Sequence, residues 1–196
     1  MPVSFVLVSF FAIYLVVRNG TISYQKASGL LVFSGIVIFC FYSFILLKER
    51  LPVEKFGYDA VFFILLILCF AWGGDTAAYF AGRAFGKHKL APKVSPKKTI
   101  EGSIGGIAGN VVCGLLFVLV MDRAFGAGIS YGAMALLALL CSIVAQVGDL
   151  SFSLIKREFG IKDYGHLFLE HGGVLDRFDS VRFVTPVIEI ILSFVK

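Results

Sequence analysis

The chain alternates long apolar runs with short polar segments. The runs lie at about 3–17, 29–47, 60–81, 103–120, 129–147 and 181–195. Most approach the ~20 residues that a helix needs to cross a bilayer, while the first and last are shorter and could be tilted, kinked or partly re-entrant. The pattern predicts an all-α, polytopic membrane bundle of about six transmembrane helices. Since no repeat or linker interrupts it, residues 1–196 are expected to form a single integral-membrane domain.

Composition supports a membrane protein. Hydrophobic residues make up 58% of the chain, charged residues only 16%, and the mean hydropathy is +0.89. Soluble domains carry about 25% charged residues. The net charge of +5 comes from cations in the loops between apolar runs. Membrane lipid headgroups or a phosphorylated substrate therefore suit this charge better than nucleic acid does.

The cations are also unevenly divided between alternate loops. Most lysines and arginines fall on one side of the predicted bundle, concentrated in segments 82–102 and 148–180. The positive-inside rule places that side in the cytoplasm. We therefore expect a multi-pass protein of the cell (inner or plasma) membrane whose two polar segments meet in one compartment.

The second polar segment begins where the fifth apolar run ends, at Asp149. If the helix continues, Asp149, Ser153 and Lys156 share one face, with Arg157 at its edge. This polar stripe would face something polar. The alternative is that Lys156 and Arg157 only extend into lipid headgroups at the membrane surface.

Further along the same segment, acidic residues gather. Asp176 and Asp179 are spaced to share a helix face, with Arg177 between them. Magnesium prefers one or two carboxylates together with substrate phosphate oxygens, so Asp149 and Asp176 are a candidate metal pair. The competing interpretation is internal ion pairing with Arg177 or Arg182.

His171, Gly172 and Gly173 precede this acidic group. Two adjacent glycines allow close approach of the backbone to a ligand, which suits oxygen coordination or a phosphate cradle. A tight turn accounts for two glycines equally well.

The first polar segment starts from an aspartate inside an apolar run. Asp75 follows Trp72, Gly73 and Gly74, and a carboxylate at that depth costs about 2.5–3.5 kcal/mol on insertion scales. We therefore expect Asp75 in the bundle interior with a partner. A structural hydrogen bond and a functional role explain it equally well.

Hydroxyl and ammonium groups stand just ahead of the fourth apolar run: Ser95, Lys97, Lys98 and Thr99. Such groups before a helix N-terminus make a good polyphosphate receptor, although they could also serve only as a positive-inside anchor. The glycines that follow, Gly102, Gly106 and Gly109, are spaced for close packing against another helix.

Together these segments resemble the phosphatidate cytidylyltransferases, also called CDP-diacylglycerol synthases. The resemblance covers roughly residues 70–180. Its motifs are Asp75-Thr76-x-Ala78-Tyr79-Phe80, Gly86-Lys87-His88, Ser95-Pro96-Lys97-Lys98-Thr99-x-Glu101-Gly102, Ser153-x-x-Lys156-Arg157, Lys162-Asp163-x-Gly165 and His171-Gly172-Gly173-Val174-x-Asp176-Arg177-Phe178-Asp179.

The resemblance implies magnesium-dependent transfer of a cytidylyl group from CTP to phosphatidic acid, with release of pyrophosphate, in phospholipid biosynthesis. It implies that Asp149 and Asp176 hold Mg²⁺, with a second, monovalent cation as a further option. The implied catalytic set adds Lys156, Arg157 and His171, the last as a loop or phosphate contact. The implied substrate-binding residues are Ser95, Lys97, Lys98, Thr99, Lys162, Asp163, Gly172, Gly173, Arg177, Asp179 and Asp75.

Two departures from the family pattern stand out. Leu169-Glu170 replaces the usual Pro-Gly before His171, and N-terminal helices of typical members are expected to be absent. Several alternatives stay open. They are a CTP-dependent enzyme acting on an ether lipid or polyprenol, a lipid kinase, an ion-coupled transporter and a structural membrane protein. Homodimer formation is left open as well.

Overall fold

The computed structural model describes Ser9, Ile13 and Val17 and residues 24–50, 59–126, 128–161 and 179–195. Internal contacts divide the chain into two compact units, Met1–Tyr42 and Ser43–Lys196. Helix α2 (Tyr24–Arg50) crosses the boundary between them. Most of the predicted first run, 3–17, lies outside the described residues, and the expectation of a single domain stays a prediction.

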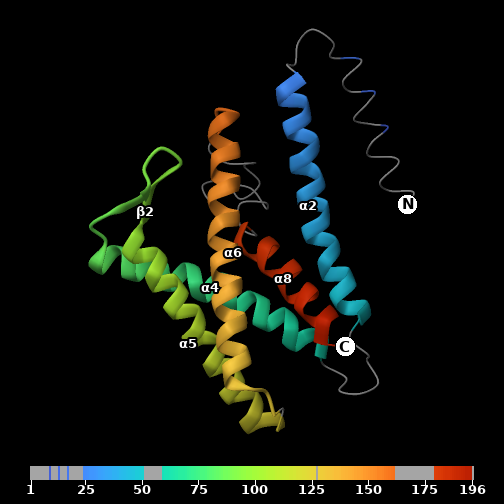
Figure 1. Cartoon of the computed structure of the whole chain (residues 1–196), viewed down its shortest axis with the longest axis vertical. Coiled ribbons are helices and arrows are strands. Elements are labelled where there is room, and N and C mark those ends of the chain that lie inside the picture. Colours follow the sequence, from blue (N-terminus) through green and yellow to red (C-terminus); the bar gives the residue numbers. More distant parts are fainter. Residues whose placement is uncertain are drawn as a thin grey trace, which may run out of the picture. The chain divides into compact units, whose positions relative to one another are not determined.

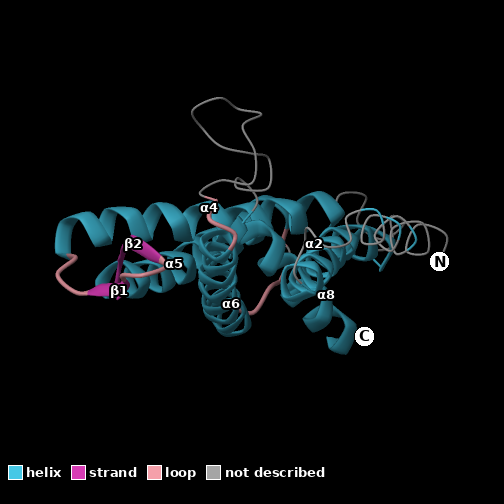
Figure 2. Ribbon diagram, turned by 90° about the horizontal axis from the view of Figure 1, so that it is seen from above, coloured by secondary structure: helices cyan, strands magenta, loops and turns pink. Residues whose placement is uncertain are grey.

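The described part of the second unit is almost wholly helical (Figure 1). Its elements are α4 (Asp59–Phe85), β1 (Lys89–Ala91), β2 (Ser95–Thr99), α5 (Ile100–Phe125), α6 (Tyr131–Glu158) and α8 (Asp179–Val195). Figure 2 shows the two short strands beside the start of α5. They pair antiparallel, with Lys89 opposite Thr99 and Ala91 opposite Ser95. The all-α prediction is confirmed, with this small hairpin as an addition.

Four of the described helices are long and apolar enough to cross a membrane. The stretches are Leu31–Glu49, Val61–Phe85, Ile100–Phe125 and Tyr131–Glu158. They coincide with the second to fifth predicted runs, so the polytopic membrane fold follows from the hydropathy pattern. The sixth run forms α8, a 17-residue helix. The predicted total of about six spans is therefore not reached within the described part of the chain.

Capping residues set the helix ends. Thr99 Oγ1 accepts a hydrogen bond of 3.1 Å from the backbone N–H of Gly102, which starts α5 directly after strand β2. At the other end Gly126 takes a left-handed conformation with φ 61°. Ser130 caps α6 in the same way as Thr99 caps α5. Helix α5 therefore begins before its apolar run at 103–120, whereas α6 begins within its run at 129–147.

Helices α4 and α5 pack through small residues, as the glycine spacing predicted. A Cβ on Gly102 would lie 2.9 Å from the carbonyl oxygen of Ala78 and 3.2 Å from Cα of Gly82. A Cβ on Gly109 would lie 2.2 Å from Cβ of Ala77. The backbones can approach this closely only because glycine has no side chain. Close packing brings α4 and the start of α5 to the same cavity.

Helix α8 is held against α6 by aromatic contacts. The ring of Phe183 lies against Gly148 and meets the Phe152 ring edge-on at 5.2 Å between centroids. The Arg182 guanidinium lies 4.2 Å above the Phe152 ring, and its side chain is 0% exposed. A cation–π contact of this kind stabilises a buried guanidinium. The packing fixes the first turn of α8 beside α6.

Candidate active site

A cavity of about 370 Å³ lies among α4, α5, α6 and the hairpin. Its lining combines charged side chains of both signs with uncharged polar ones. The charged residues are Asp75, Arg83, Lys97, Lys98 and Asp149, and the uncharged polar ones include Thr99, Ser103, Asn110, Ser142 and Gln146. A mixed-charge cavity at the ends of apolar helices is costly to maintain, which indicates a binding function.

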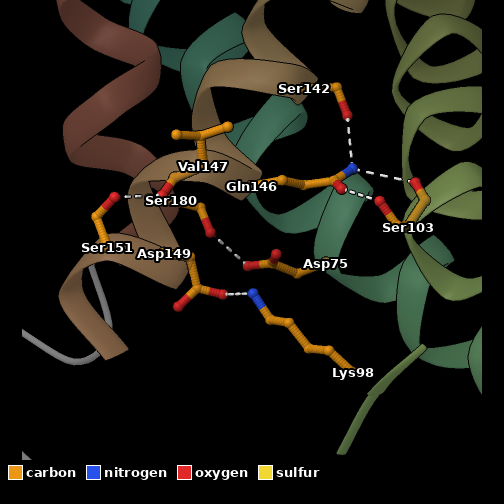
Figure 3. A network of polar contacts seen from close by, with 9 residues as sticks. All are labelled: Asp75, Lys98, Ser103, Ser142, Gln146, Val147, Asp149, Ser151 and Ser180. Carbon is orange, nitrogen blue, oxygen red and sulfur yellow. Dashed lines mark hydrogen bonds and ion pairs between the residues drawn. The ribbon is translucent and has the colours of Figure 1, made fainter. Parts of the chain in front are cut away.

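An ion pair joins the two polar segments within this cavity. Lys98 Nζ, from strand β2, contacts Asp149 Oδ2, from α6 (Figure 3). A second contact lies nearby, where Arg157 Nε donates a hydrogen bond of 3.3 Å to the backbone oxygen of Val94 in the hairpin turn. The prediction that segments 82–102 and 148–180 converge is thus confirmed for their described parts. The compartment that they face stays a prediction.

Asp75, a carboxylate within a membrane-spanning helix, has the hydrogen-bond partner that was expected for it. Ser180 Oγ donates a hydrogen bond of 2.9 Å to Asp75 Oδ2, which joins α4 to the start of α8. Asp75 also interacts electrostatically with Asp149 and Lys98. Figure 3 shows the two carboxylates and the lysine pointing toward one another. The site therefore gathers side chains from α4, β2, α6 and α8.

A neutral hydrogen-bond network lies one turn deeper along α6. Ser103 Oγ donates to Gln146 Oε1, while Gln146 Nε2 donates to the backbone oxygen of Ser103 at 3.1 Å and to Ser142 Oγ at 3.5 Å. These bonds tie α5 to α6, and Figure 3 shows them above the ion pair. Sequence reasoning assigned Gln146 no role. The helical spacing of Ser142, Gln146 and Asp149 was the signal that could have found this polar face.

The hairpin is also tied to α5 at its base. His88 Nδ1 lies 2.6 Å from Glu101 Oε1, and the His88 backbone N–H donates to both carboxylate oxygens of Glu101 at 3.2 Å. The backbone N–H of Ile100 donates to the His88 oxygen at 3.0 Å. Both residues belong to the quoted motifs, yet no sequence pattern predicted that they pair. The contact holds β1 against the first turn of α5.

The predicted site residues divide into two groups. Asp75, Lys97, Lys98, Thr99 and Asp149 line the cavity, and Ser95 begins β2. Lys156 and Arg157 lie in the last turn of α6, and Asp179 begins α8. The remaining predicted residues lie outside the described part of the chain: Lys162, Asp163, His171, Gly172, Gly173, Asp176 and Arg177.

The metal pair Asp149–Asp176 is accordingly untested and stays a prediction. Within residues 24–50, 59–126, 128–161 and 179–195, no group of three or more histidine, cysteine or acidic side chains gathers that could hold a metal ion by itself. Thr99 has a structural task in any case, because its hydroxyl caps α5.

The fold and the cavity define a class: a membrane-embedded helical protein with a polar, mixed-charge site between its helix ends. The family follows from comparison with known sequences. A model of the Cytidylyltransferase family matches residues 1–195. The chain belongs to this family.

Among similar proteins is the phosphatidate cytidylyltransferase of Bacillus subtilis (strain 168). It is 35% identical over 181 residues, which cover 92% of this chain and 63% of that protein. The phosphatidate cytidylyltransferase of Staphylococcus haemolyticus is 44% identical over 134 residues, 68% of this chain and 50% of that protein. That of Brucella suis biovar 1 is 48% identical over 128 residues, 65% of this chain and 44% of that protein. The chain thus spans about half to somewhat under two thirds of the length of these relatives.

Proposed function

We propose that the protein transfers a cytidylyl group from CTP to phosphatidic acid, giving CDP-diacylglycerol and pyrophosphate. The observation that carries the proposal is the Lys98–Asp149 ion pair, which joins the Ser95–Gly102 motif to the predicted metal ligand on α6 within one cavity. Relatives at 35–48% identity carry the name of this activity. The mixed-charge cavity fits a triphosphate, because its cations match phosphate and its carboxylates match a phosphate-bound cation.

The donor atoms around the cavity suit a hard cation such as Mg²⁺. The available ligands are carboxylate and hydroxyl oxygens from Asp75, Asp149 and Ser103, which hard cations prefer. In the proposal Asp149 and Asp176 hold the cation, and a monovalent cation beside it is a further option. The position of α8 supports this pairing. The helix begins three residues after Asp176, and its Ser180 is bonded to Asp75 beside Asp149. The bound cation would supply charge neutralisation on the phosphates of CTP.

The chain's own cations would orient the triphosphate. Lys97 and Lys98 approach the cavity from β2, while Lys156 and Arg157 stand at the end of α6. Their ammonium and guanidinium groups would bind phosphate oxygens and offset the charge that grows on the leaving pyrophosphate. The phosphate of phosphatidic acid is already ionised, so it attacks the α-phosphorus of CTP without a general base. The protein's contribution is then alignment and electrostatic stabilisation.

The position of the cavity is consistent with a lipid substrate. It is bounded by the membrane-spanning helices α4, α5 and α6 and by the basic hairpin. A lipid phosphate in the leaflet lies at the same depth as the ends of such helices. We propose that this end faces the cytoplasm, because the cation-rich segments converge there. CTP would then enter from the aqueous side.

A reconstituted assay tests the proposal. The protein in nanodiscs containing phosphatidic acid, supplied with labelled CTP and Mg²⁺, should form labelled CDP-lipid, and chelation of Mg²⁺ should stop it. Asp149→Asn should remove at least about 99% of the turnover, since losing a metal or transition-state contact costs 10²–10³-fold. The matched control is Asp122→Asn at the other end of α5, where the amide oxygen can still accept the bond from the Ile129 N–H.

Three results would overturn the proposal. Asp149→Asn could keep near-full turnover, or the wild-type chain could label an ether-lipid or polyprenyl phosphate and leave phosphatidic acid unlabelled. Ion uptake into proteoliposomes without CTP would instead favour a transporter.

A further inference from the structure

The Lys98–Asp149 contact places a lysine on the carboxylate that the proposed function gives to a metal. Lys98 Nζ touches Asp149 Oδ2 directly, and the two side chains are 31% and 22% exposed. A carboxylate oxygen that accepts a close ammonium cannot hold a divalent cation at the same position. Lysine and metal must therefore exclude each other at Oδ2 of Asp149.

The backbone of Lys98 is held independently of this contact. Strand β2 pairs with β1 on one side, and Thr99, the next residue, is buried and caps α5. The His88–Glu101 contact ties the base of the hairpin to the same helix. The hairpin does not need to open for Lys98 to leave Asp149. Rotation of its flexible four-carbon side chain is enough.

The surroundings give the released ammonium a place to go. The cavity is shared with Lys97, and it is the space in which the proposed function puts the CTP phosphates. Phosphate oxygens bind an ammonium at least as well as a carboxylate does. A complex of CTP with the metal would supply both the cation that replaces Lys98 at Asp149 and the phosphate oxygens that bind the released ammonium group.

We propose that Lys98 is the exchangeable counter-ion of Asp149: it neutralises the carboxylate until the divalent cation binds and then transfers to the phosphates of CTP. The inference rests on the proposed function. It gives Lys98 two opposite effects. In the absence of nucleotide the lysine competes with the metal, and during turnover it helps to bind the triphosphate. Removing the ammonium should therefore strengthen metal binding while weakening catalysis.

The test measures metal binding without substrate. Mn²⁺, which has an electron-spin signal, is titrated into the full chain in neutral detergent with no CTP or lipid phosphate present. Lys98→Met keeps an unbranched apolar side chain and removes the charge. It should bind Mn²⁺ roughly tenfold more tightly than wild type, because a unit charge in direct contact no longer competes. Turnover of the same variant with CTP and phosphatidic acid should fall at least about tenfold.

Lys97→Met is the matched control. It removes the same charge from the neighbouring position, which also lines the cavity, but it leaves the Lys98–Asp149 pair intact. Its Mn²⁺ affinity should change less than about twofold, since Lys97 is exposed and an exposed charge that is not in direct contact interacts weakly through water. Lys98→Arg, which keeps the charge, should bind Mn²⁺ as wild type does.

The outcomes separate this inference from the proposed function. Equal or weaker Mn²⁺ binding by Lys98→Met, or an equal gain in Lys97→Met, overturns the exchange. If Lys98→Met gains Mn²⁺ affinity and turnover is absent even in wild type, the proposed reaction is wrong, while the competition between Lys98 and the metal at Asp149 stands. If no variant binds Mn²⁺, both the exchange and the metal site are wrong. Misfolding does not produce the expected result, because a gain in affinity requires an intact site.

Discussion

Ser180 Oγ donates a hydrogen bond of 2.9 Å to Asp75 Oδ2, across 105 positions of the chain. The bond connects α4 to the first turn of α8 and lies beside the Lys98–Asp149 pair (Figure 3). It provides the partner that an aspartate within a membrane-spanning helix needs. Helix α8 begins three residues after Asp176, the metal ligand that the sequence predicts.

Removing the hydroxyl should disturb the site more than the fold. We expect Ser180→Ala to lower the free energy of unfolding by about 1–2 kcal/mol, the cost of leaving one polar group unpaired. Turnover should fall by more than the loss of folded protein explains. The Mg²⁺ concentration that gives the half-maximal rate should rise. Ser180→Thr, which restores the hydroxyl, should recover most of the activity. The measurements are thermal unfolding in detergent and the Mg²⁺ dependence of CDP-lipid formation.

Ser151→Ala provides the control for this substitution. Among the described residues, Ser151 Oγ donates to the backbone oxygen of Val147 within its own helix, at 2.8 Å, and the side chain is exposed. Its loss should leave the Mg²⁺ dependence unchanged. A shift of equal size in both serine variants would show that the Asp75–Ser180 bond has no special role.

The Gln146–Ser103 hydrogen bonds should stabilise the packing of α5 against α6, about one helical turn before Asp149. Gln146→Leu keeps the approximate size of the side chain and removes its hydrogen bonds to Ser103 and Ser142. A double-mutant cycle with Ser103→Ala should give a coupling energy of about 0.6–1.7 kcal/mol, the range for hydrogen bonds between membrane helices. The measurement is unfolding by a denaturing detergent. A coupling energy of zero would mean that the two side chains stabilise the helix pair independently.

Gly148 should tolerate no side chain. A Cβ there would lie 2.1–2.6 Å from three atoms of the Phe183 ring, so α8 would have to move away from α6. We expect Gly148→Ala to destabilise the protein by about 2 kcal/mol, as overpacking of a core does, and to reduce turnover by displacing Ser180. The added substitution Phe183→Leu should restore part of the loss.

Gly132→Ala, on the same helix, is the reference for this change. The nearest atom to its added Cβ would be Ser130 Oγ at 4.0 Å, so the space is open. Helix propensity then predicts equal or slightly higher stability. If both alanine variants melt alike, the contact between Gly148 and Phe183 is not what positions α8.

The membrane-spanning helices of this protein could be predicted because each of them contains a long, nearly uninterrupted run of apolar residues. A run of about twenty apolar residues has few stable conformations in a bilayer other than a helix, and four such helices were found where the runs indicated. Their ends could not be located in the same way. They depend on single capping residues such as Thr99 and Ser130, which hydropathy alone does not single out. The short hairpin escaped prediction because a lysine-rich segment with Pro92 and Pro96 has little β propensity.

The sequence could predict which segments form the site, but not which residues contact each other within it. The uneven distribution of cations predicted that residues 82–102 and 148–180 lie on the same side of the bundle. The contacts of Lys98 and Arg157 agree with this prediction. Which lysine meets Asp149 depends on the register of β2, and no local pattern encodes it. The partner of Asp75 lies on a helix from the far end of the chain. Gln146 was missed because a single neutral amide within an apolar helix carries a signal only when its helical spacing from Ser142 and Asp149 is considered.

The predicted metal pair can be separated from the neighbouring carboxylate by two asparagine substitutions. Asp176→Asn removes the charge of a proposed ligand, so Mn²⁺ affinity without nucleotide should fall at least about tenfold and CDP-lipid formation should stop. Asp75→Asn keeps an oxygen that can accept the hydrogen bond from Ser180. Its Mn²⁺ affinity should fall only about twofold to threefold, through the lost electrostatic attraction near Asp149. If Asp75→Asn instead loses Mn²⁺ binding and Asp176→Asn keeps it, the cation is held by Asp75 and Asp149, and the predicted pair of Asp149 and Asp176 is wrong.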